Sequence, residues 1–261
     1  MMRSLYTAAT GMEAQETKMS VIAHNLANTS TTGFKKTRAE FEDLLSDTIR
    51  SAAPPSPQGG SAPSALQVGL GVRTAATTRS QAQGDMINTG NPLDICIEGT
   101  GYFQIQRANG EPAYTRSGNF RVDSTGRLVT QNGEQVEPSI TVPQETLGLP
   151  IQADGQVLAK MPGRDEPTVL GTLELATFAN PAALESVGGN LMITSAASGE
   201  ATQVRPGEGG SGALAQGFLE GANVKAVEEM IDMITTQRAY EMNSKVITTA
   251  DQMLQKLTSL R

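Results

Sequence analysis

Residues capable of chemistry are few in this chain. It contains one histidine, His24, and one cysteine, Cys96, and they lie far apart in the sequence. Nucleophilic catalysis needs a nucleophile within hydrogen-bond reach of a base. His24 comes at the predicted end of a helix, where a capping or solvent-facing role is expected. Cys96 stands between two isoleucines in a strand-like run, which is typical of a small buried hydrophobe.

The acidic residues do not suggest a catalytic or metal site either. Asp85, Asp94 and Glu98 are close in sequence, but their spacing does not match a calcium loop. Two carboxylates can serve a glycosidase, yet aromatic residues make up 4% of the chain and no aromatic-rich segment offers a sugar platform. Gly99 and Gly101 lack the third glycine and the βαβ context of a dinucleotide fingerprint. The sequence therefore predicts a protein that is not an enzyme, with no metal, cofactor or small-molecule substrate.

Charge divides the chain into ends and a middle. The 261 residues have a formal net charge of −7, which argues against a nucleic-acid partner, because a nucleic-acid groove needs clustered lysine and arginine. Residues 1–36 and 222–261 together carry 9 basic and 7 acidic residues, whereas residues 37–221 carry 11 basic and 20 acidic residues. The ends and the middle are therefore expected to face different surroundings.

Neither a membrane span nor a cleavable signal peptide is predicted. No run approaches the 18 apolar residues that a spanning helix needs. The opening stretch, MMRSLYTAATGM, lacks the continuous apolar region of a cleavable signal. Taken alone, these features suggest a cytoplasmic protein.

Both ends of the chain read as helices. Near the N-terminus, large apolar residues recur at seven-residue intervals, as expected for a helical seam; they are Leu5, Met12, Met19 and Leu26, with Ile22 on the same face. The alternative interpretation is an ordinary surface helix on a globular core.

The C-terminal helix is predicted to be long. No glycine or proline occurs between residues 224 and 261, so a helix of roughly 57 Å is expected. Asn223 is a plausible N-cap, and Glu228 and Glu229 lie near the positive end of the helix dipole. Its apolar residues form two successive seams, which are Val224, Val227, Ile231 and Ile234, then Met242, Val246, Ala250, Met253, Leu257 and Leu260. One short partner helix cannot cover this seam.

The stretch NLANTSTTGFKK, residues 25–36, reads as a stop-and-turn element. Asn25 and Asn28 can bond local backbone groups and so compete with helix continuation. Gly33 can adopt a left-handed conformation, after which Phe34 can fold back onto the chain. We expect this stretch to be a joint between a helical arm and the rest of the chain.

The middle of the chain is predicted to be β-rich. Short apolar runs such as YFQIQ (102–106) alternate with tight-turn signals such as Asn109-Gly110 and Asn132-Gly133. A small antiparallel barrel or sandwich is expected. Residues 51–65, rich in proline, glycine and serine, read as a linker that is either a passive tether or a clamp between neighbouring copies.

The predicted fold is α+β: long N- and C-terminal α-helices pair as a coiled-coil-like inner domain, and a mainly antiparallel β domain is inserted between them. The predicted domains are residues 1–36 with 222–261 for the helical part, 37–95 with 200–221 for an extended connecting segment, and 96–199 for the outer β-rich part.

Several motifs resemble those of the bacterial flagellar rod and hook family. NLANTSTTGFKK (25–36) resembles its N-terminal signature, GDMINTGNPLDICIEGTGYFQI (84–105) and YTRSGNFRVDSTGRLVTQNGEQV (114–136) its β domain, and residues 216–257 its C-terminal signature. Within the family, residues 3–16 and 37–50 and the chain length are most similar to subunits of the distal rod.

The resemblance implies a structural role outside the cytoplasm. The chain would be exported unfolded by the flagellar type III apparatus, without a cleavable signal, and its helices would stack in the inner tube of a helical homo-polymer, ordering mainly on assembly. The rod crosses the periplasm to the outer membrane. The implied partners are proximal rod subunits, hook subunits, peptidoglycan and outer-membrane ring proteins, the export apparatus and the rod cap.

Fifteen residues of the seams and the joint are the candidates for self-assembly. They are Leu5, Met12, Met19, Ile22, Leu26, Asn28, Gly33, Phe34, Val227, Ile231, Ile234, Met242, Val246, Met253 and Leu257. Two alternatives stay open at this point: a proximal rod or hook subunit of the same family, and a secreted β-domain enzyme with coiled-coil arms.

Overall fold

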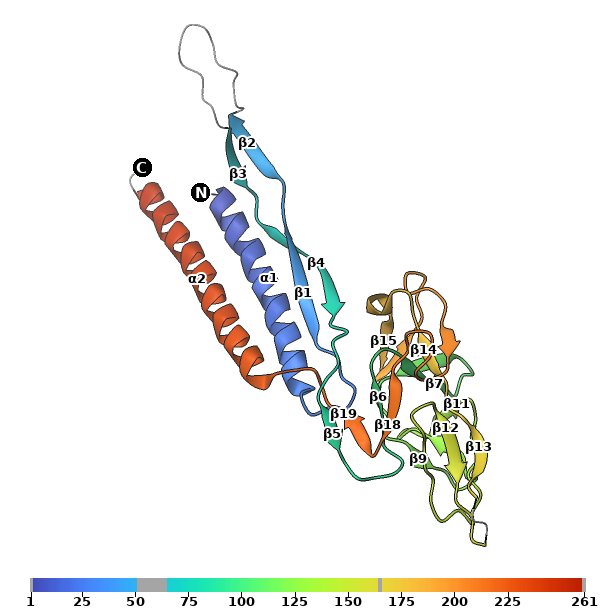
Figure 1. Cartoon of the computed structure of the whole chain (residues 1–261). Helices are drawn as coiled ribbons and strands as arrows, with labels where there is room; N and C mark the ends of the chain where they lie inside the picture. The colour runs from blue at the N-terminus through green and yellow to red at the C-terminus, as the bar shows by residue number, and fades with distance from the viewer. Residues whose placement is uncertain (1, 51–64, 164–165, 260–261) are drawn as a thin grey trace. The chain divides into compact units, whose positions relative to one another are not determined.

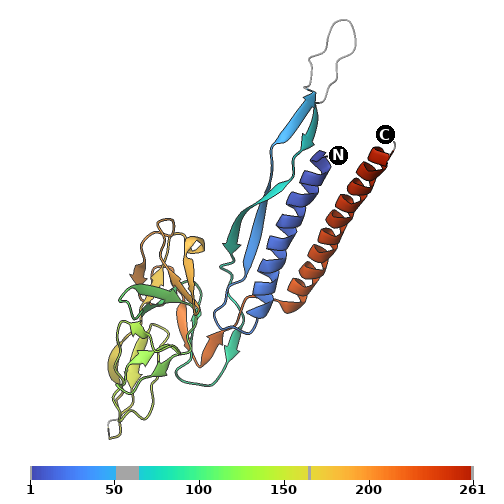
Figure 2. The same ribbon diagram turned by 180° about the vertical axis from the view of Figure 1, so that it is seen from behind.

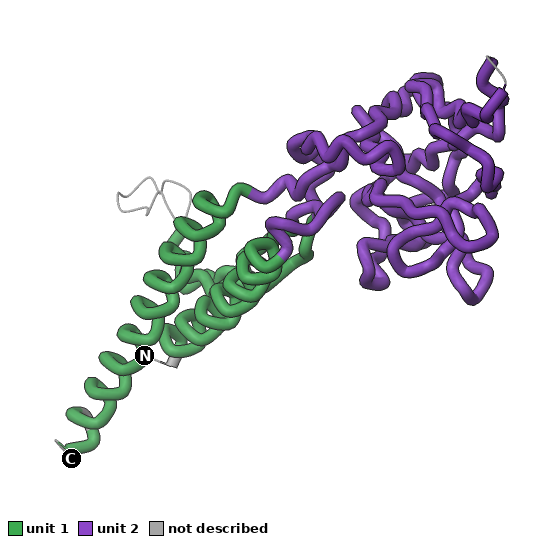
Figure 3. The backbone as a smooth tube through the Cα atoms, turned by 90° about the horizontal axis from the view of Figure 1, so that it is seen from below, with its two compact units in different colours: residues 1–27, 37–78, 225–261 green, residues 28–36, 79–224 purple. Residues whose placement is uncertain are grey.

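A computed structural model describes residues 2–50, 65–163 and 166–259. The chain forms two compact units, shown in different colours in Figure 3. Unit 1 comprises Met1–Ala27, Thr37–Thr78 and Lys225–Arg261, and unit 2 comprises Asn28–Lys36 and Arg79–Val224. These bounds differ from the predicted ones at residues 36, 95 and 199, and the three-part division stays a prediction.

Unit 1 contains both helices, and they pack against each other as predicted. α1 spans Met2–Ala27 and α2 spans Ala226–Ser259. They lie side by side in both views (Figures 1 and 2). Neither helix contains proline, and α2 contains no glycine either, which favours continuous helices. Among the described residues, no helix is both long and apolar enough to cross a membrane.

The predicted N-cap of α2 is wrong. The helix begins three residues after Asn223, whose side chain is used within unit 2 instead. Its Oδ1 accepts a hydrogen bond from the Lys36 backbone N–H at 2.7 Å, and its Nδ2 donates to the Ala82 carbonyl at 2.9 Å. Asn223 therefore ties two strand-like segments together just before the helix starts.

Unit 1 also contains two antiparallel ribbons that the sequence reasoning treated only as extended chain. β1 (Thr37–Asp43) pairs with β4 (Val72–Arg79), and β2 (Ser46–Arg50) pairs with β3 (Leu66–Gly69). Residues 51–64 of the predicted linker lie outside the described residues. Two-stranded ribbons are marginal on their own in water, so these strands depend on what packs against them; β1 contacts α1.

Unit 2 is built on a nine-stranded antiparallel sheet. Its central strand is β7, which pairs with β8 along one edge and with β14 and β11 along the other. The strands of this sheet are β7 (Tyr102–Gln106), β8 (Pro112–Thr115), β9 (Arg121–Val122), β10 (Leu128–Val129), β11 (Gln135–Glu137), β14 (Leu175–Thr177), β15 (Glu185–Gly188), β16 (Leu191–Ile193) and β17 (Thr202–Val204).

Three shorter ribbons and one turn of 3-10 helix complete unit 2. They are β5 (Met86–Asn88) with β19 (Phe218–Glu220), β6 (Ile95–Glu98) with β18 (Ala213–Gln216), β12 (Gln156–Ala159) with β13 (Thr168–Thr172), and η1 (Pro181–Ala183). The predicted β-rich middle and the predicted turns are confirmed: Gly110 and Gly133 both have positive φ.

The core of unit 2 is apolar and closed. Phe103 and Phe120 meet edge to face at its centre, with ring centroids 5.0 Å apart. Ile97 and Leu173 are fully buried beside them. The strands that line this core carry runs of buried residues, such as 95–97 in β6 and 113–115 in β8, so both faces of these strands are covered. Unit 2 therefore has a hydrophobic core of its own.

Candidate functional site: an assembly surface

The face that α2 turns toward α1 carries buried polar and small residues. Glu229, Thr236 and Ala250 are buried and occur at seven-residue multiples, so they lie along one stripe. Asn25 of α1 donates from Nδ2 to Oε2 of Glu229 at 3.1 Å. The Thr236 hydroxyl donates to the Asp232 carbonyl one turn earlier at 2.7 Å, so its burial leaves no donor unmet. The two helices are therefore paired through small and hydrogen-bonded residues.

Close approach of the helices depends on a glycine. A Cβ added at Gly11 of α1 would lie 2.9 Å from Nδ2 of Asn243 on α2. Asn243 belongs to the same seven-residue stripe as Glu229 and Thr236. Ala8 and Ala14 of α1 are buried as well. These small residues of α1 therefore let the polar side chains of α2 approach α1 closely.

The apolar residues of α2 face outward. Six of the predicted assembly residues are between 47% and 71% exposed; they are Val227, Ile231, Ile234, Met242, Val246 and Met253. Near the C-terminal half of α2, three of them line a shallow apolar groove within unit 1, together with Ser4 and Thr249. The structure thus brings these side chains into one outward-facing row and buries none of them within the chain.

The predicted residues of α1 are less exposed. Ile22 is buried, and Leu5, Met12, Met19 and Leu26 are half-buried. The side chain of the last predicted residue, Leu257, lies outside the described residues. We call the six exposed residues of α2 the outer face.

The predicted joint is residues 25–36; α1 continues to Ala27, and residues 28–36 form the turn. Gly33 has φ of +69°, and a Cβ there would lie 2.7 Å from the Ser117 backbone nitrogen. Only glycine meets both demands. Asn28 accepts a hydrogen bond from the Thr31 hydroxyl at 3.2 Å, and the Phe34 N–H donates to the Thr31 carbonyl at 3.3 Å. These contacts fold the segment back on itself directly after α1.

Asn25 closes the base of the joint from within unit 1. Its Nδ2 donates to the Thr37 carbonyl at 2.8 Å, and its Oδ1 accepts from the Thr37 N–H at 2.9 Å. This two-way bond joins the last turn of α1 to the first residue of β1. Asn25 therefore bonds backbone that lies beyond the turn, and it is buried in doing so.

A buried ionic cluster holds the joint in unit 2, and sequence reasoning missed it. Lys35 Nζ lies 2.5 Å from one oxygen of Glu220, and Arg116 Nε lies 2.7 Å from the other. All three side chains are at most 5% exposed. We call Lys35, Arg116 and Glu220 the buried triad. Lys35 and Lys36 are adjacent residues of the same type, and the sequence around them does not indicate which one is buried. No local signal therefore predicts that Lys35 belongs to the triad.

Backbone groups complete the triad. Arg116 donates to the Gly101 carbonyl at 2.7 Å and to the Gly99 carbonyl at 2.8 Å. Gly99 and Gly101 have φ of +118° and +132°, and this backbone conformation accounts for the Gly-x-Gly motif without a nucleotide. Lys35 also donates to the Ala82 carbonyl at 2.7 Å. Buried charges are tolerated when they are paired and hydrogen-bonded in this way.

The triad sets the protonation of its members. Burial alone would raise the pKa of the Glu220 carboxyl, but the adjacent Arg116 and Lys35 outweigh it and lower that pKa below its usual range. Burial lowers the pKa of the Lys35 ammonium, although Glu220 opposes the shift. Glu220 therefore supplies the single negative charge that pairs with both Lys35 and Arg116.

The two residues considered first for chemistry lie apart from any catalytic arrangement. His24 is exposed in the last turn of α1. Cys96 is fully buried in β6, as predicted, and burial raises the pKa of its thiol to about 11. No group of three or more metal-binding side chains occurs within residues 2–50, 65–163 and 166–259.

Three family models match successive parts of the chain. A model described as "Flagella basal body rod protein" matches residues 5–35, one described as "Flagellar hook protein FlgE/F/G D1 domain" matches residues 96–159, and one described as "Flagellar basal body rod FlgEFG protein C-terminal" matches residues 215–260.

Full-length relatives agree with these matches. The chain is 48% identical to the flagellar basal-body rod protein FlgG of Caulobacter vibrioides over the whole of both sequences. The chain belongs to the family of flagellar basal-body rod proteins. The rod protein FlgG of Bacillus subtilis is 40% identical, again over both full lengths. The flagellar hook protein FlgE of Treponema pallidum is 41% identical over 52% of this chain and 29% of its own length.

Each matched part of this rod-family protein supplies one member of the buried triad. Lys35 lies in the first, Arg116 in the second and Glu220 in the third. All fifteen residues predicted for assembly lie in the first and third parts. The triad therefore connects the three recognisable segments of the chain, whereas the outer face belongs to the C-terminal segment alone.

Proposed function

We propose that the chain is a structural, self-assembling subunit of the distal flagellar rod, a rigid helical drive shaft that transmits torque from motor to hook. It has no enzymatic role. The shaft crosses the periplasm to the outer membrane, and its subunits are exported without a cleavable signal peptide. Its partners are further copies of itself, proximal rod and hook subunits, the peptidoglycan and outer-membrane ring proteins, the export apparatus and the rod cap.

The outer face of α2 carries this proposal. Burying a Val, Ile or Met side chain stabilises by roughly 1.5–3 kcal/mol. Six such side chains in one outward-facing row make a large apolar patch, and large patches mark interaction sites. A helix of a neighbouring copy has the shape and the apolar seam to cover them. A contact between unlike faces of identical subunits generates a helical filament when it does not close into a ring.

The polar pairing of α1 with α2 supports the same function. A buried polar residue in a helical seam specifies register at some cost in stability. Asn25 and Glu229 meet in this way at one end of the pair. Because the contact between α1 and α2 uses this hydrogen bond and small residues such as Gly11, the six exposed apolar residues of α2 are left for contacts between subunits.

The assembly test uses a residue that is exposed in the single chain. Ile231→Asp puts a charge into a contact between copies, where it costs several kcal/mol unless paired, but Ile231 is 56% exposed in the chain itself. We expect this variant to keep the helicity of the wild type at low concentration and to lose the filaments that electron microscopy detects at high concentration.

Gln237→Asp is the matched control, because Gln237 is an exposed polar residue on the same helix. It adds the same charge and should assemble normally. Filaments of normal length from Ile231→Asp would contradict the outer face as the assembly surface.

A second experiment separates the distal rod from the rest of the family. Basal bodies isolated from a strain lacking this gene should end in a shortened rod that does not reach the outer-membrane ring. A full-length rod without a hook would instead indicate a hook subunit, and the absence of any rod would indicate a proximal position.

A further inference from the structure

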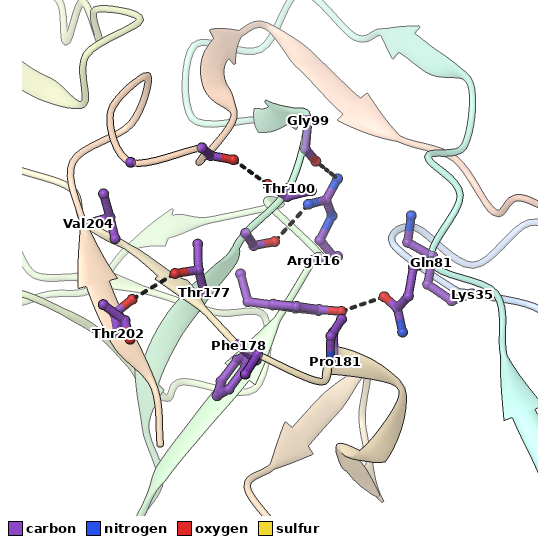
Figure 4. A pocket seen from close by; sticks show the side chains of 15 residues that line it. Lys35, Gln81, Gly99, Thr100, Arg116, Thr177, Phe178, Pro181, Thr202 and Val204 are labelled. Atoms are coloured by element: carbon purple, nitrogen blue, oxygen red, sulfur yellow. Dashed lines mark hydrogen bonds between the residues drawn. The ribbon is translucent and has the colours of Figure 1, made fainter. Parts of the chain in front are cut away.

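Unit 2 contains a cavity that assembly through the helices does not use. Its volume is about 620 Å³, which lies within the range of small-ligand pockets. Phe178, Pro181 and Val204 form apolar walls (Figure 4), and Tyr102 also lines the cavity. Glycines 99, 101, 209 and 210 leave other parts of the wall as bare backbone. An apolar group of moderate size can therefore enter.

The charge of the lining is positive. Its charged side chains are Lys35 and Arg116, and none of the described lining residues is acidic. Glu220 lies behind them and divides its single negative charge between both cations. Arg79 is half-buried nearby, where it donates to the Met192 sulfur at 3.0 Å, a much weaker partner than a carboxylate. Of these four charged groups, three are positive and one is negative.

Hydrogen-bonding capacity is also left over on this side of the cavity. The Tyr102 hydroxyl donates to Oε1 of Gln81 at 2.7 Å, as Figure 4 shows. Gln81 is an exposed residue, and its Nε2 group has no hydrogen-bond partner among the described residues. An ammonium has three donors, and Lys35 has two assigned, to Glu220 and to the Ala82 carbonyl. Both groups can donate to an acceptor in the cavity.

We propose that this cavity binds a carboxylate carried on an apolar body. The carboxylate would lie at the Lys35 and Gln81 side, and the apolar part would lie between Phe178 and Val204. Two sources share this chemistry, a small free carboxylic acid and an acidic residue flanked by apolar ones on a second copy of the chain. The proposal does not depend on the function proposed above, because it rests on unit 2 alone.

Binding is tested with phenylacetate on the full-length protein at low concentration. The four tyrosines are replaced by 3-fluorotyrosine, and the Tyr102 signal is assigned with Tyr102→Phe. We expect phenylacetate to shift this ¹⁹F signal saturably and at least fivefold more tightly than its neutral analogue phenylacetamide. Equal affinity for both ligands, or no saturable shift, would overturn the proposal.

Two variants locate the site. Gln81→Leu nearly keeps the volume but removes both the Nε2 donor and the Oε1 that accepts from the Tyr102 hydroxyl, so the Tyr102 signal of the free variant is recorded first. It should weaken phenylacetate binding by about fivefold, as expected for one net hydrogen bond. Val204→Trp fills the cavity and should abolish binding. Unchanged binding in both variants would place the ligand elsewhere and refute the site. Circular dichroism shows whether each variant folds, and Gln81→Leu retains the test if Val204→Trp does not.

Filaments assembled without added ligand show which of the two sources supplies the carboxylate. If a second copy supplies it, solid-state ¹⁹F spectra of filaments should show the shifted Tyr102 signal, and phenylacetate should slow assembly. If the ligand is a small molecule, the Tyr102 signal should stay at its free position in filaments. Ile231→Asp, which tests the proposed function, should leave phenylacetate binding unchanged.

Discussion

The two units differ in where most of their large apolar side chains lie. In unit 2 the core is apolar, with Phe103 and Ile97 fully buried. In unit 1 the helix contact buries Glu229 and Thr236, whereas Ile231 on the same helix is 56% exposed. Unit 2 is thus built to be stable as a single chain. Unit 1 hydrogen-bonds its buried Glu229 and Thr236 internally and leaves large apolar side chains of α2 exposed.

An ion pair in unit 1 and the buried triad in unit 2 also differ in how exposed their side chains are. Arg3 and Asp47 in unit 1 lie 2.6 Å apart but are about half exposed, and such pairs contribute roughly 0–1 kcal/mol. The buried triad of unit 2 is at most 5% exposed, so removing one member leaves a charge without compensation. The comparison predicts which unit responds to a given substitution.

The largest effect is expected from Glu220→Gln. It keeps the shape of the side chain but leaves Lys35 and Arg116 buried without a counter-charge, which costs roughly 3–5 kcal/mol. Hydrogen exchange of the β7 amides, read by mass spectrometry, should show this loss. Glu228→Gln is the control, since Glu228 pairs with Lys225 on the surface of α2 and its loss should cost less than about 1 kcal/mol. Equal effects of the two variants would disprove the role of the triad.

A pair of identical substitutions sharpens the comparison of the cores. Ile97→Ala removes a fully buried side chain of unit 2 and should cost about 2–5 kcal/mol. Ile231→Ala removes an exposed side chain of unit 1 and should change the stability of the dilute monomer by less than about 0.5 kcal/mol. Urea unfolding at low concentration measures both. If Ile231→Ala destabilised the monomer as much as Ile97→Ala, the outer face would be part of an internal core.

Two glycines of unit 2 separate backbone strain from crowding. Gly133→Ala meets no described atom within 4 Å, so only its φ of +85° opposes a side chain, at about 1–2 kcal/mol. Gly33→Ala has a similar φ and also meets backbone atoms of Arg116 and Ser117 within 3 Å, so its cost should be roughly 2–4 kcal/mol. Thermal unfolding of the two variants compares them. Equal melting temperatures would mean that residues 28–36 do not pack as described.

The smallest effect is a pH dependence. The pKa of Glu220 is lowered from its ordinary 4.5, because the two adjacent cations outweigh its burial. As the pH falls, the unfolded chain therefore takes up this proton before the folded chain does. The stability that Glu220 contributes is fully present above about pH 4.5 and is lost as the pH falls through the pKa of the folded state. Urea midpoints measured from pH 7 to pH 3 should fall less steeply in Glu220→Gln than in the wild type. Parallel slopes would contradict the lowered pKa.

Much of the architecture could be predicted from the sequence because its signals are local. The seven-residue spacing from Leu5 to Leu26 predicted α1, and the absence of glycine and proline after residue 224 predicted α2. YFQIQ predicted β7 with its bounds, and the positive φ of Gly33 followed from its place after a polar turn. Each of these features depends on neighbours within a few positions.

The rest depends on contacts between distant residues. Apolar periodicity located the outer face but gave no sign that the buried stripe of α2 is polar, because burial of Glu229 depends on Asn25. The triad was missed because Lys35 and Glu220 are 185 positions apart. Asn223 looked like a helix cap, and its actual partners, Lys36 and Ala82, are equally remote. For the same reason, whether the outer face binds another copy stays a prediction.

The large sequence separation within the triad determines when residues 28–36 can fold relative to the rest of the chain. A chain that emerges N-terminus first presents Lys35 and Arg116 long before Glu220, which lies in the last strand, β19. The Gly33 N–H also bonds the Glu220 carbonyl, so the joint lacks both anchors until that strand arrives. Residues 28–36 can therefore take their final form only after nearly the whole chain is available. A chain cut short before β19 would retain an open joint, and only complete molecules would present both helices as finished building blocks.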